Sequence, residues 1–267
     1  MHILLPTDFS DGSLNACAYA LDLFGSTGNT FTLLHTYFDP VPDNAAMAGM
    51  SKALYEGSVD GMTSFLERFR SLQNGADADA RTEVLYGPHT VVITDLCIER
   101  SVDIIAMGTQ GASGTPLFGT LAGEVAKASK VPVLIVPKDA RFTGLGRILL
   151  ADDHKSVEPL AMRLLVRLAR QHEAAVTIAH VLRGGADAPD PRIIADYDTT
   201  LSNVEHSYIG APGDDVALTL NNVAERDKVD LVAVLHRHTG FLDSLFHKST
   251  AKHLAMHSRI PLLVLEH

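Results

Sequence analysis

The chain has 267 residues, 46% of them hydrophobic and 20% charged, which is the balance of a soluble globular protein with room for two domains. Its formal net charge of −10 repels nucleic acid and anionic membranes, and no cluster of Lys and Arg is evident that would offset this repulsion. Cys17 and Cys97 lie in helical apolar patterns without a CxxC spacing, no leader precedes the first strand, and no apolar run reaches membrane-spanning length, so we expect a cytoplasmic protein.

The first half of the chain alternates short apolar strands with segments of helical periodicity. Ser10 or Ser13 is placed to cap the first helix. Residues 39–50 contain two prolines and no clear period, so we expect a mobile loop there. In chain order the predicted elements are strand 2–5, a helix through 14–21, strand 30–37, helix 51–72, strand 81–86, a helix opened by Gly87-Pro88, strand 104–107, a helix from Thr120 and strand 131–136.

A glycine-rich segment follows the strand at 104–107. Its glycines occupy positions 108, 111, 114 and 119, and a helix is predicted to begin at Thr120. Glycines let backbone N–H groups approach an anion closely, and the free N–H groups at a helix start attract the same anion. Thr120 suits both an N-cap and a hydroxyl donor. The pattern predicts a phosphate cradle, although turns also require glycine and a plain turn explains the same residues.

The strands are near-continuous apolar runs, which is typical of a parallel sheet covered by helices on both faces. Ligands bind such sheets beyond the carboxyl ends of the strands. Asp8, Thr36 and the segment 108–111 lie at the ends of the first, second and fourth strands, so we expect one crevice to hold all three. A turn or cap aspartate is the structural alternative for Asp8.

The second half of the chain repeats the first. Residues 148–153 match 3–8 at an offset of 145 (148 − 3), and 177–180 match 32–35 at the same offset (180 − 35). Later strands match at shorter offsets, 127 (229 − 102) and 129 (260 − 131), so the second copy has lost residues between its second and fourth strands. We therefore predict a domain at 1–138, a linker at 139–146 and a second, degenerate domain at 147–267.

Four motifs in order resemble a tandem universal stress protein over essentially the whole chain: P-T-D-F-S after the first strand, L-L-H-T-Y in the second, G-T-Q-G…G-T after the fourth and V-P-V-L-I-V in the fifth. The resemblance implies two tandem open parallel five-stranded sheets, Rossmann-like, with helices on both faces. It also implies that the first domain binds ATP or AMP, with Mg²⁺ or Mn²⁺ held through the phosphates. Asp8 would meet the adenosine part, and the backbone around Thr36 would flank the adenine. The nucleotide-binding residues implied in this way are Pro6, Thr7, Asp8, Thr36, Met107, Gly108, Gln110, Gly111, Gly119, Thr120 and Leu121.

The chain departs from the family pattern G-x2-G-x9-G-[S/T] in both copies. In the first copy seven residues rather than nine separate Gly111 from Gly119, which affects the phosphate grip more than the adenosine pocket. The second copy keeps the nine-residue spacing but has Leu235, His238 and Lys248-Ser249 in place of the glycines. Their side chains occupy the room that a phosphate needs, so we predict a second cleft that holds no nucleotide.

Metal binding and catalysis are not indicated. His35 and His180 occupy equivalent strand positions, and we interpret them as structural histidines with satisfied hydrogen bonds. No nucleophile elbow, Walker lysine or carboxylate pair lies near the cradle, so no enzyme is predicted, and slow ATP hydrolysis is left open. A compact ligand motif such as H-E-x-x-H is also missing around the remaining histidines of the second half, His236, His238, His247, His253 and His257.

Two functions of different classes follow. The first is a stress-response protein that binds an adenine nucleotide in its first domain and uses the second as a scaffold. The alternative is a nucleotide-free interaction or signalling module that acts through its surface or dimer contacts. A third option is a small metabolite or a metal ion in the altered second cleft. The resemblance also implies an intramolecular pseudo-dimer joined through the last strands, 131–136 and 260–265, with a homodimer also open, because those edges are otherwise exposed.

Overall fold

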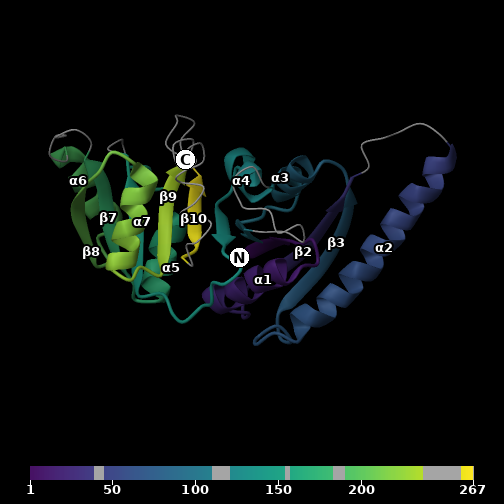
Figure 1. The fold of residues 1–267 in the computed structure, drawn as a ribbon. Coiled ribbons are helices and arrows are strands. Elements are labelled where there is room, and N and C mark those ends of the chain that lie inside the picture. Colours follow the sequence, from purple (N-terminus) through teal and green to yellow (C-terminus); the bar gives the residue numbers. More distant parts are fainter. Residues whose placement is uncertain (39–44, 110–120, 154–156, 183–189, 237–259, 267) are drawn as a thin grey trace. The chain divides into compact units, whose positions relative to one another are not determined.

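The computed structural model describes residues 1–38, 45–109, 121–153, 157–182, 190–236 and 260–266. The chain divides into two compact units, Met1–Arg141 and Phe142–His267 (Figure 1). This division falls inside the segment 139–146 that the sequence predicts as a linker.

Unit 1 contains β1 (His2–Pro6), α1 (Asp11–Phe24), β2 (Thr30–Tyr37), α2 (Ala45–Arg70), β3 (Asp79–Tyr86), α3 (His89–Glu99), β4 (Ile104–Gly108), α4 (Leu121–Ala128) and β5 (Val133–Val136). The strands pair in parallel in the order β3-β2-β1-β4-β5. Helices α1 and α2 contact each other on one face of this sheet, and α3 and α4 contact each other on the other face (Figure 1).

Unit 2 contains β6 (Arg147–Asp152), α5 (Arg163–Gln171), β7 (Ala175–Leu182), α6 (Pro191–Thr200), β8 (His206–Pro212), α7 (Val216–Arg226), β9 (Leu231–His236) and β10 (Leu262–Glu266). Its strands also pair in parallel, in the order β10-β9-β6-β7-β8. In this order β6, β7, β8, β9 and β10 correspond to β1, β2, β3, β4 and β5, so the two units have the same strand order, written here from opposite ends. The predicted fold class, two tandem open parallel five-stranded sheets with helices on both faces, is confirmed.

The burial of the central strands explains why the sequence predicts them as continuous apolar runs. Ile3, Leu4 and Leu5 of β1 are completely buried, as are Ile104 and Ile105 of β4. A parallel strand with helices on both of its faces has no side that water reaches, so every position favours an apolar side chain. β3 lies at the edge of its sheet, and its side chains are mostly exposed or half-buried.

The long helix α2 differs from its prediction. We expected a mobile loop over 39–50 and a helix from 51, but the helix begins at Ala45. The two prolines of this segment stand at positions 40 and 42, before the helix, and residues 45–50 include three alanines and two methionines, which favour helix. Residues 39–44 lie outside the described part of the chain. The counterpart in unit 2, α6, has 10 residues against 26 in α2, which accounts for most of the shortened offset.

Equivalent backbone contacts recur in both units. The Oδ2 atom of Asp103 accepts a hydrogen bond from the backbone N of His2 at 2.7 Å, and that of Asp230 accepts one from the backbone N of Arg147 at 2.9 Å. Each bond ties the turn before the fourth strand of a unit to the start of its first strand. The pairs Val102-Asp103 and Val229-Asp230, which match at the offset of 127, therefore form a structural motif, and the duplication extends to individual hydrogen bonds.

Candidate functional site

Residues predicted to form one site lie along the carboxyl edge of the first sheet. β2, β1 and β4 are neighbours in that sheet, and Pro6 is in register with Leu34 of β2. Because parallel strands end at the same edge, Asp8, Thr36 and Gly108 share this edge. The structure describes seven of the implied residues, Pro6, Thr7, Asp8, Thr36, Met107, Gly108 and Leu121, whereas Gln110, Gly111, Gly119 and Thr120, together with the shortened loop, lie outside the described residues.

Thr7 organises the turn that leaves β1. Its buried hydroxyl oxygen lies 2.9 Å from the hydroxyl oxygen of Ser13 and accepts a hydrogen bond from the backbone N of Phe9, also at 2.9 Å. The backbone N of Thr7 donates to the carbonyl of Leu34 at 2.8 Å, which continues the pairing of β1 with β2 by one residue. The hydroxyl and the backbone N of Thr7 both make hydrogen bonds within the turn and the sheet, so the role of Thr7 is to position its neighbours.

Asp8 is exposed and holds the start of α1. Its Oδ1 atom accepts hydrogen bonds from the backbone N and the hydroxyl of Ser10, at 3.2 and 2.6 Å. Ser10 is the N-cap of α1, and its hydroxyl oxygen accepts from the backbone N of Ser13. Of the two predicted caps, Ser10 is therefore the one used. One carboxylate oxygen of Asp8 therefore makes the contact expected of a turn or cap aspartate, which was the structural alternative to a binding role.

An imidazole and a phenyl ring stack beside this turn. The rings of Phe9 and His35 have centroids 4.2 Å apart and planes inclined by 25°. Nδ1 of His35 donates to the carbonyl of Thr7 at 2.8 Å, and burial lowers the pKa of His35, which favours the neutral ring. His180 of unit 2 makes the equivalent bond to the carbonyl of Asp152 at 3.1 Å. The interpretation of both residues as hydrogen-bonded structural histidines is confirmed.

Thr36 lies at the end of β2, next to an aromatic group. Its buried hydroxyl is 2.7 Å from Nδ1 of His89, at the start of α3. The ring of Tyr86 is 5.5 Å from that of Tyr37 and 5.9 Å from that of Phe38. Tyr86 and Phe38 are 55% and 43% exposed, so aromatic surface is accessible to a flat ligand at this end of β2 and β3. Our sequence analysis missed His89 and this aromatic group, although the Gly87-Pro88 turn marked their position.

Gly108 is required by packing, whatever it binds. A Cβ atom at this position would lie 3.0 Å from the carbonyl oxygen of Gly12, in the first turn of α1. The close approach of α1 to the end of β4 therefore explains this glycine without a phosphate. The next backbone N, that of Thr109, donates to the carbonyl of Val136 at 3.0 Å. The backbone N of Thr109 is therefore already paired within the sheet.

The described residues include neither a cluster of metal ligands nor an ionised thiol. Among the residues that the structure describes, no group of three or more His, Cys, Asp or Glu can hold a metal ion. Burial raises the pKa of Cys97 to about 12 and that of Cys17 further, so both are protonated core thiols at neutral pH.

Described side chains form hydrogen bonds with one another at the equivalent edge of the second sheet. The hydroxyl of Tyr197, from α6, donates to Oδ1 of the buried Asp152 at 3.0 Å. At the ends of β9 and β10, Nδ1 of His236 donates a hydrogen bond to Oε2 of Glu266 at 3.0 Å. Leu235, which replaces Gly108, is buried. The sequence analysis missed Tyr197 and Glu266, and its other second-copy residues, His238, Lys248 and Ser249, lie outside the described ranges.

A doubly wound parallel sheet with polar and aromatic side chains at its carboxyl edge defines a Rossmann-like α/β protein. The model of the universal stress protein family matches residues 1–137, which is just over half of the 267 residues, and the chain belongs to this family. None of the helices in the described part of the chain is long and apolar enough to cross a membrane.

Solved structures show the same fold over the full length. A universal stress protein from Archaeoglobus fulgidus DSM 4304 is 20% identical, with 99% of this chain and 96% of that chain covered and a TM-score of 0.73. A functionally unknown protein from Pseudomonas aeruginosa PAO1 is 15% identical, with 99% and 92% covered and a TM-score of 0.56. A comparison with curated proteins found no match. At these identities the likeness concerns the fold, and it includes the second half of the chain.

Proposed function

We propose that this protein is a cytoplasmic stress-response protein that binds an adenine nucleotide, ATP or AMP, at the carboxyl edge of its first unit. The second unit is a scaffold. The observation that carries this proposal is the difference between the two edges. The first presents the exposed Asp8 beside a glycine and accessible aromatic rings, whereas at the second the hydroxyl of Tyr197 donates to the buried Asp152 and His236 contacts Glu266.

The described residues suit the adenosine part of such a ligand. A carboxylate such as that of Asp8 accepts hydrogen bonds from hydroxyl groups, and aromatic rings such as Tyr86 offer a face on which a base can stack. The ribose and phosphates are assigned to Gly108, Gln110, Gly111, Gly119, Thr120 and Leu121. A bound Mg²⁺ or Mn²⁺ would supply charge neutralisation through the phosphates. No catalytic role is assigned to any residue.

Calorimetric titration of the full-length protein with ATP, ADP and AMP tests the proposal. Asp8→Asn keeps an Oδ1 acceptor for Ser10 but removes the negative charge, so we expect nucleotide affinity to fall about tenfold, as for the loss of one charge-assisted hydrogen bond. Asp153→Asn is the matched control, since this residue occupies the same position in the second copy and should leave the affinity unchanged. Absence of binding at millimolar nucleotide would sink the proposal.

A nucleotide-free interaction module is the second candidate function. It is favoured by the exposed hydrophobic side chains around α2 and the end of β3, where Phe38, Tyr55 and Tyr86 are 43%, 48% and 55% exposed. The two candidates differ in whether a nucleotide stabilises the native state. A ligand that binds only the folded protein must raise its melting temperature, so a thermal shift with nucleotide separates them. The pairing of the two sheets through their last strands remains a prediction. The homodimer is also a prediction, and light scattering tests it by measuring the mass of the protein in solution.

A further inference from the structure

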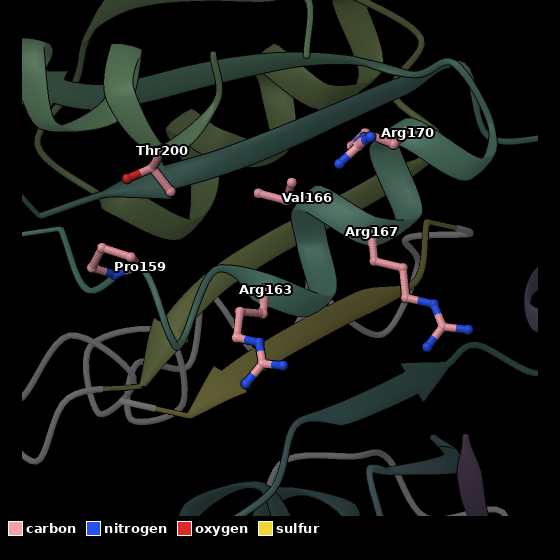
Figure 2. Close-up of a pocket in the computed structure, with 6 residues that line it drawn as sticks. All are labelled: Pro159, Arg163, Val166, Arg167, Arg170 and Thr200. Atoms are coloured by element: carbon pink, nitrogen blue, oxygen red, sulfur yellow. The ribbon is translucent and has the colours of Figure 1, made fainter. Parts of the chain in front are cut away.

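A basic hollow lies on a helical face of unit 2. Its volume is about 460 Å³, within the range of roughly 300–1,000 Å³ that is usual for small-molecule pockets. None of its lining residues belongs to a strand, so the hollow is separate from the sheet edge that carries the candidate nucleotide site. It is lined by Pro159, Arg163, Val166, Arg167, Arg170 and Thr200 (Figure 2).

Helix periodicity brings the three arginines together. In α5, Leu165, Leu168 and Ala169 are buried, while the arginines recur at spacings of four and three residues along another face. Figure 2 shows the side chains of Arg163 and Arg167 extending to the same side of the helix, with Arg170 one turn farther along. Consecutive residues of the sequence do not reveal this cluster, because it forms only when the segment is helical.

Among the described residues, no acidic side chain pairs with the three guanidinium groups. Within the part of the chain that the structure describes, no residue forms a hydrogen bond or an ion pair with them. Like charges three and four residues apart on a helix repel each other. Four other arginines each pair with an acidic residue, Arg68 with Asp11, Arg100 with Glu83, Arg192 with Asp190 and Arg226 with Asp227. In a chain with 32 acidic and 22 basic residues, the absence of any ion pair at this cluster within the described ranges leaves its positive field available to a ligand.

We propose that this hollow binds a small phosphorylated metabolite. Guanidinium groups hold phosphoryl oxygens through paired N–H donors, and three of them can hold more than one negative charge. Thr200 is not among the donors, because its hydroxyl already donates to the carbonyl of Asp196 at 2.8 Å. Pro159 and Val166 supply apolar walls for a carbon skeleton.

The ligand must be small because the whole chain is acidic. A long polyanion such as nucleic acid would extend beyond the hollow and meet the field of a protein with a net charge of −10. A small anion lies within about 8–10 Å of the arginines, the distance over which their charges act at physiological salt. This site is independent of the proposed nucleotide site, and neither requires the other.

Titration of the full-length protein with inorganic pyrophosphate tests the proposal. We expect saturable binding that weakens at least about tenfold in Arg163→Gln and in Arg167→Gln, since each loses charge-assisted hydrogen bonds. Arg192→Gln is the matched control on α6, because it removes the same charge from an exposed side chain already paired with Asp190, and its binding should equal that of the wild type.

Three results would overturn the proposal. The first is no saturable binding at millimolar pyrophosphate. The second is an equal loss in Arg192→Gln, which would show diffuse attraction to surface charge instead of a site. The third is tighter binding of citrate than of pyrophosphate in the same hollow, which would assign the arginines to carboxylates. A nucleotide affinity that falls in Asp8→Asn but stays unchanged in Arg167→Gln supports two separate sites.

Discussion

Two histidines in different units have pKa values displaced in opposite directions. Burial of His35 lowers its pKa, and its ring donates a hydrogen bond to the Thr7 carbonyl. Burial also lowers the pKa of His206, but the Val204 carbonyl and the carboxylate of Asp198, 3.0 Å from Nε2, raise it above its ordinary value. The two rings differ in that Asp198 forms a hydrogen bond with His206, whereas Asp8 acts on His35 only through its charge and the nearby His89 opposes it.

These directions predict the order of protonation as pH falls from 8 to 5. His206 should protonate above its ordinary value of about 6.5 and His35 below it, as measured by NMR of the ring nitrogens. The contribution of His206 to stability is present below about pH 6.5 and is lost as pH rises through its raised pKa. His35 acts in the opposite sense, because the unfolded chain binds its proton more readily and stability falls as pH drops below about 6.5. In Asp198→Asn the midpoint of His206 should move down, and an unchanged midpoint would contradict this account.

A second residue-scale prediction concerns helix ends. Lys228 follows the C-cap of α7 and has a φ of 51°, and Ser101 has the same φ at the equivalent place after α3. A side chain in this left-handed region costs energy that glycine avoids. Lys228→Gly should therefore raise the free energy of unfolding by about 0.5–1 kcal/mol in chemical denaturation. Glu225→Gly, inside α7, should lower it by about 1 kcal/mol, and a loss in both variants would refute the strain at Lys228.

At the scale of elements, the sequence could predict what local pattern determines. The buried runs of β1 and β4 were readable because both faces of each strand are covered, and Asp8, Thr36 and Gly108 were placed at one edge because parallel strands end together. The stack of Phe9 on His35 and the bond from Tyr197 to Asp152 were not readable, because each joins elements far apart in the chain. The start of α2 was missed because prolines at 40 and 42 were taken to govern the residues after them.

Packing of α2 over the Phe9 ring yields an element-scale prediction. A Cβ atom on Gly61 would lie 2.5 Å from Cε2 of Phe9, whereas one on Gly57 of the same helix would meet nothing within 4 Å. Gly61→Ala should therefore lower the free energy of unfolding by about 1–3 kcal/mol through overpacking. Gly57→Ala should raise it by up to about 1 kcal/mol through helix propensity alone. Equal effects of the two substitutions in denaturant titrations would show that the helix does not pack on Phe9 in solution.

At the scale of the whole molecule, the two copies share a scaffold and differ at their carboxyl edges. Asp103 and Asp230 make the same backbone contact, and His35 and His180 make the same imidazole contact. Contacts that hold the sheet together have thus been retained in both halves. The side chains at the edge have not, since Tyr197 reaches a buried carboxylate in the second copy.

This asymmetry predicts one nucleotide per chain. Tyr197→Phe removes the hydroxyl that donates to Asp152 and keeps the ring, so the buried Asp152 loses that donor. We expect the free energy of unfolding to fall by about 1–3 kcal/mol, as for a buried polar group that loses a partner. Nucleotide affinity and stoichiometry should stay those of the wild type, because the proposed site belongs to the other unit. Calorimetric titration beside thermal unfolding measures both quantities. Two nucleotides per chain, or an affinity that follows the loss of stability in Tyr197→Phe, would place binding in the second unit as well.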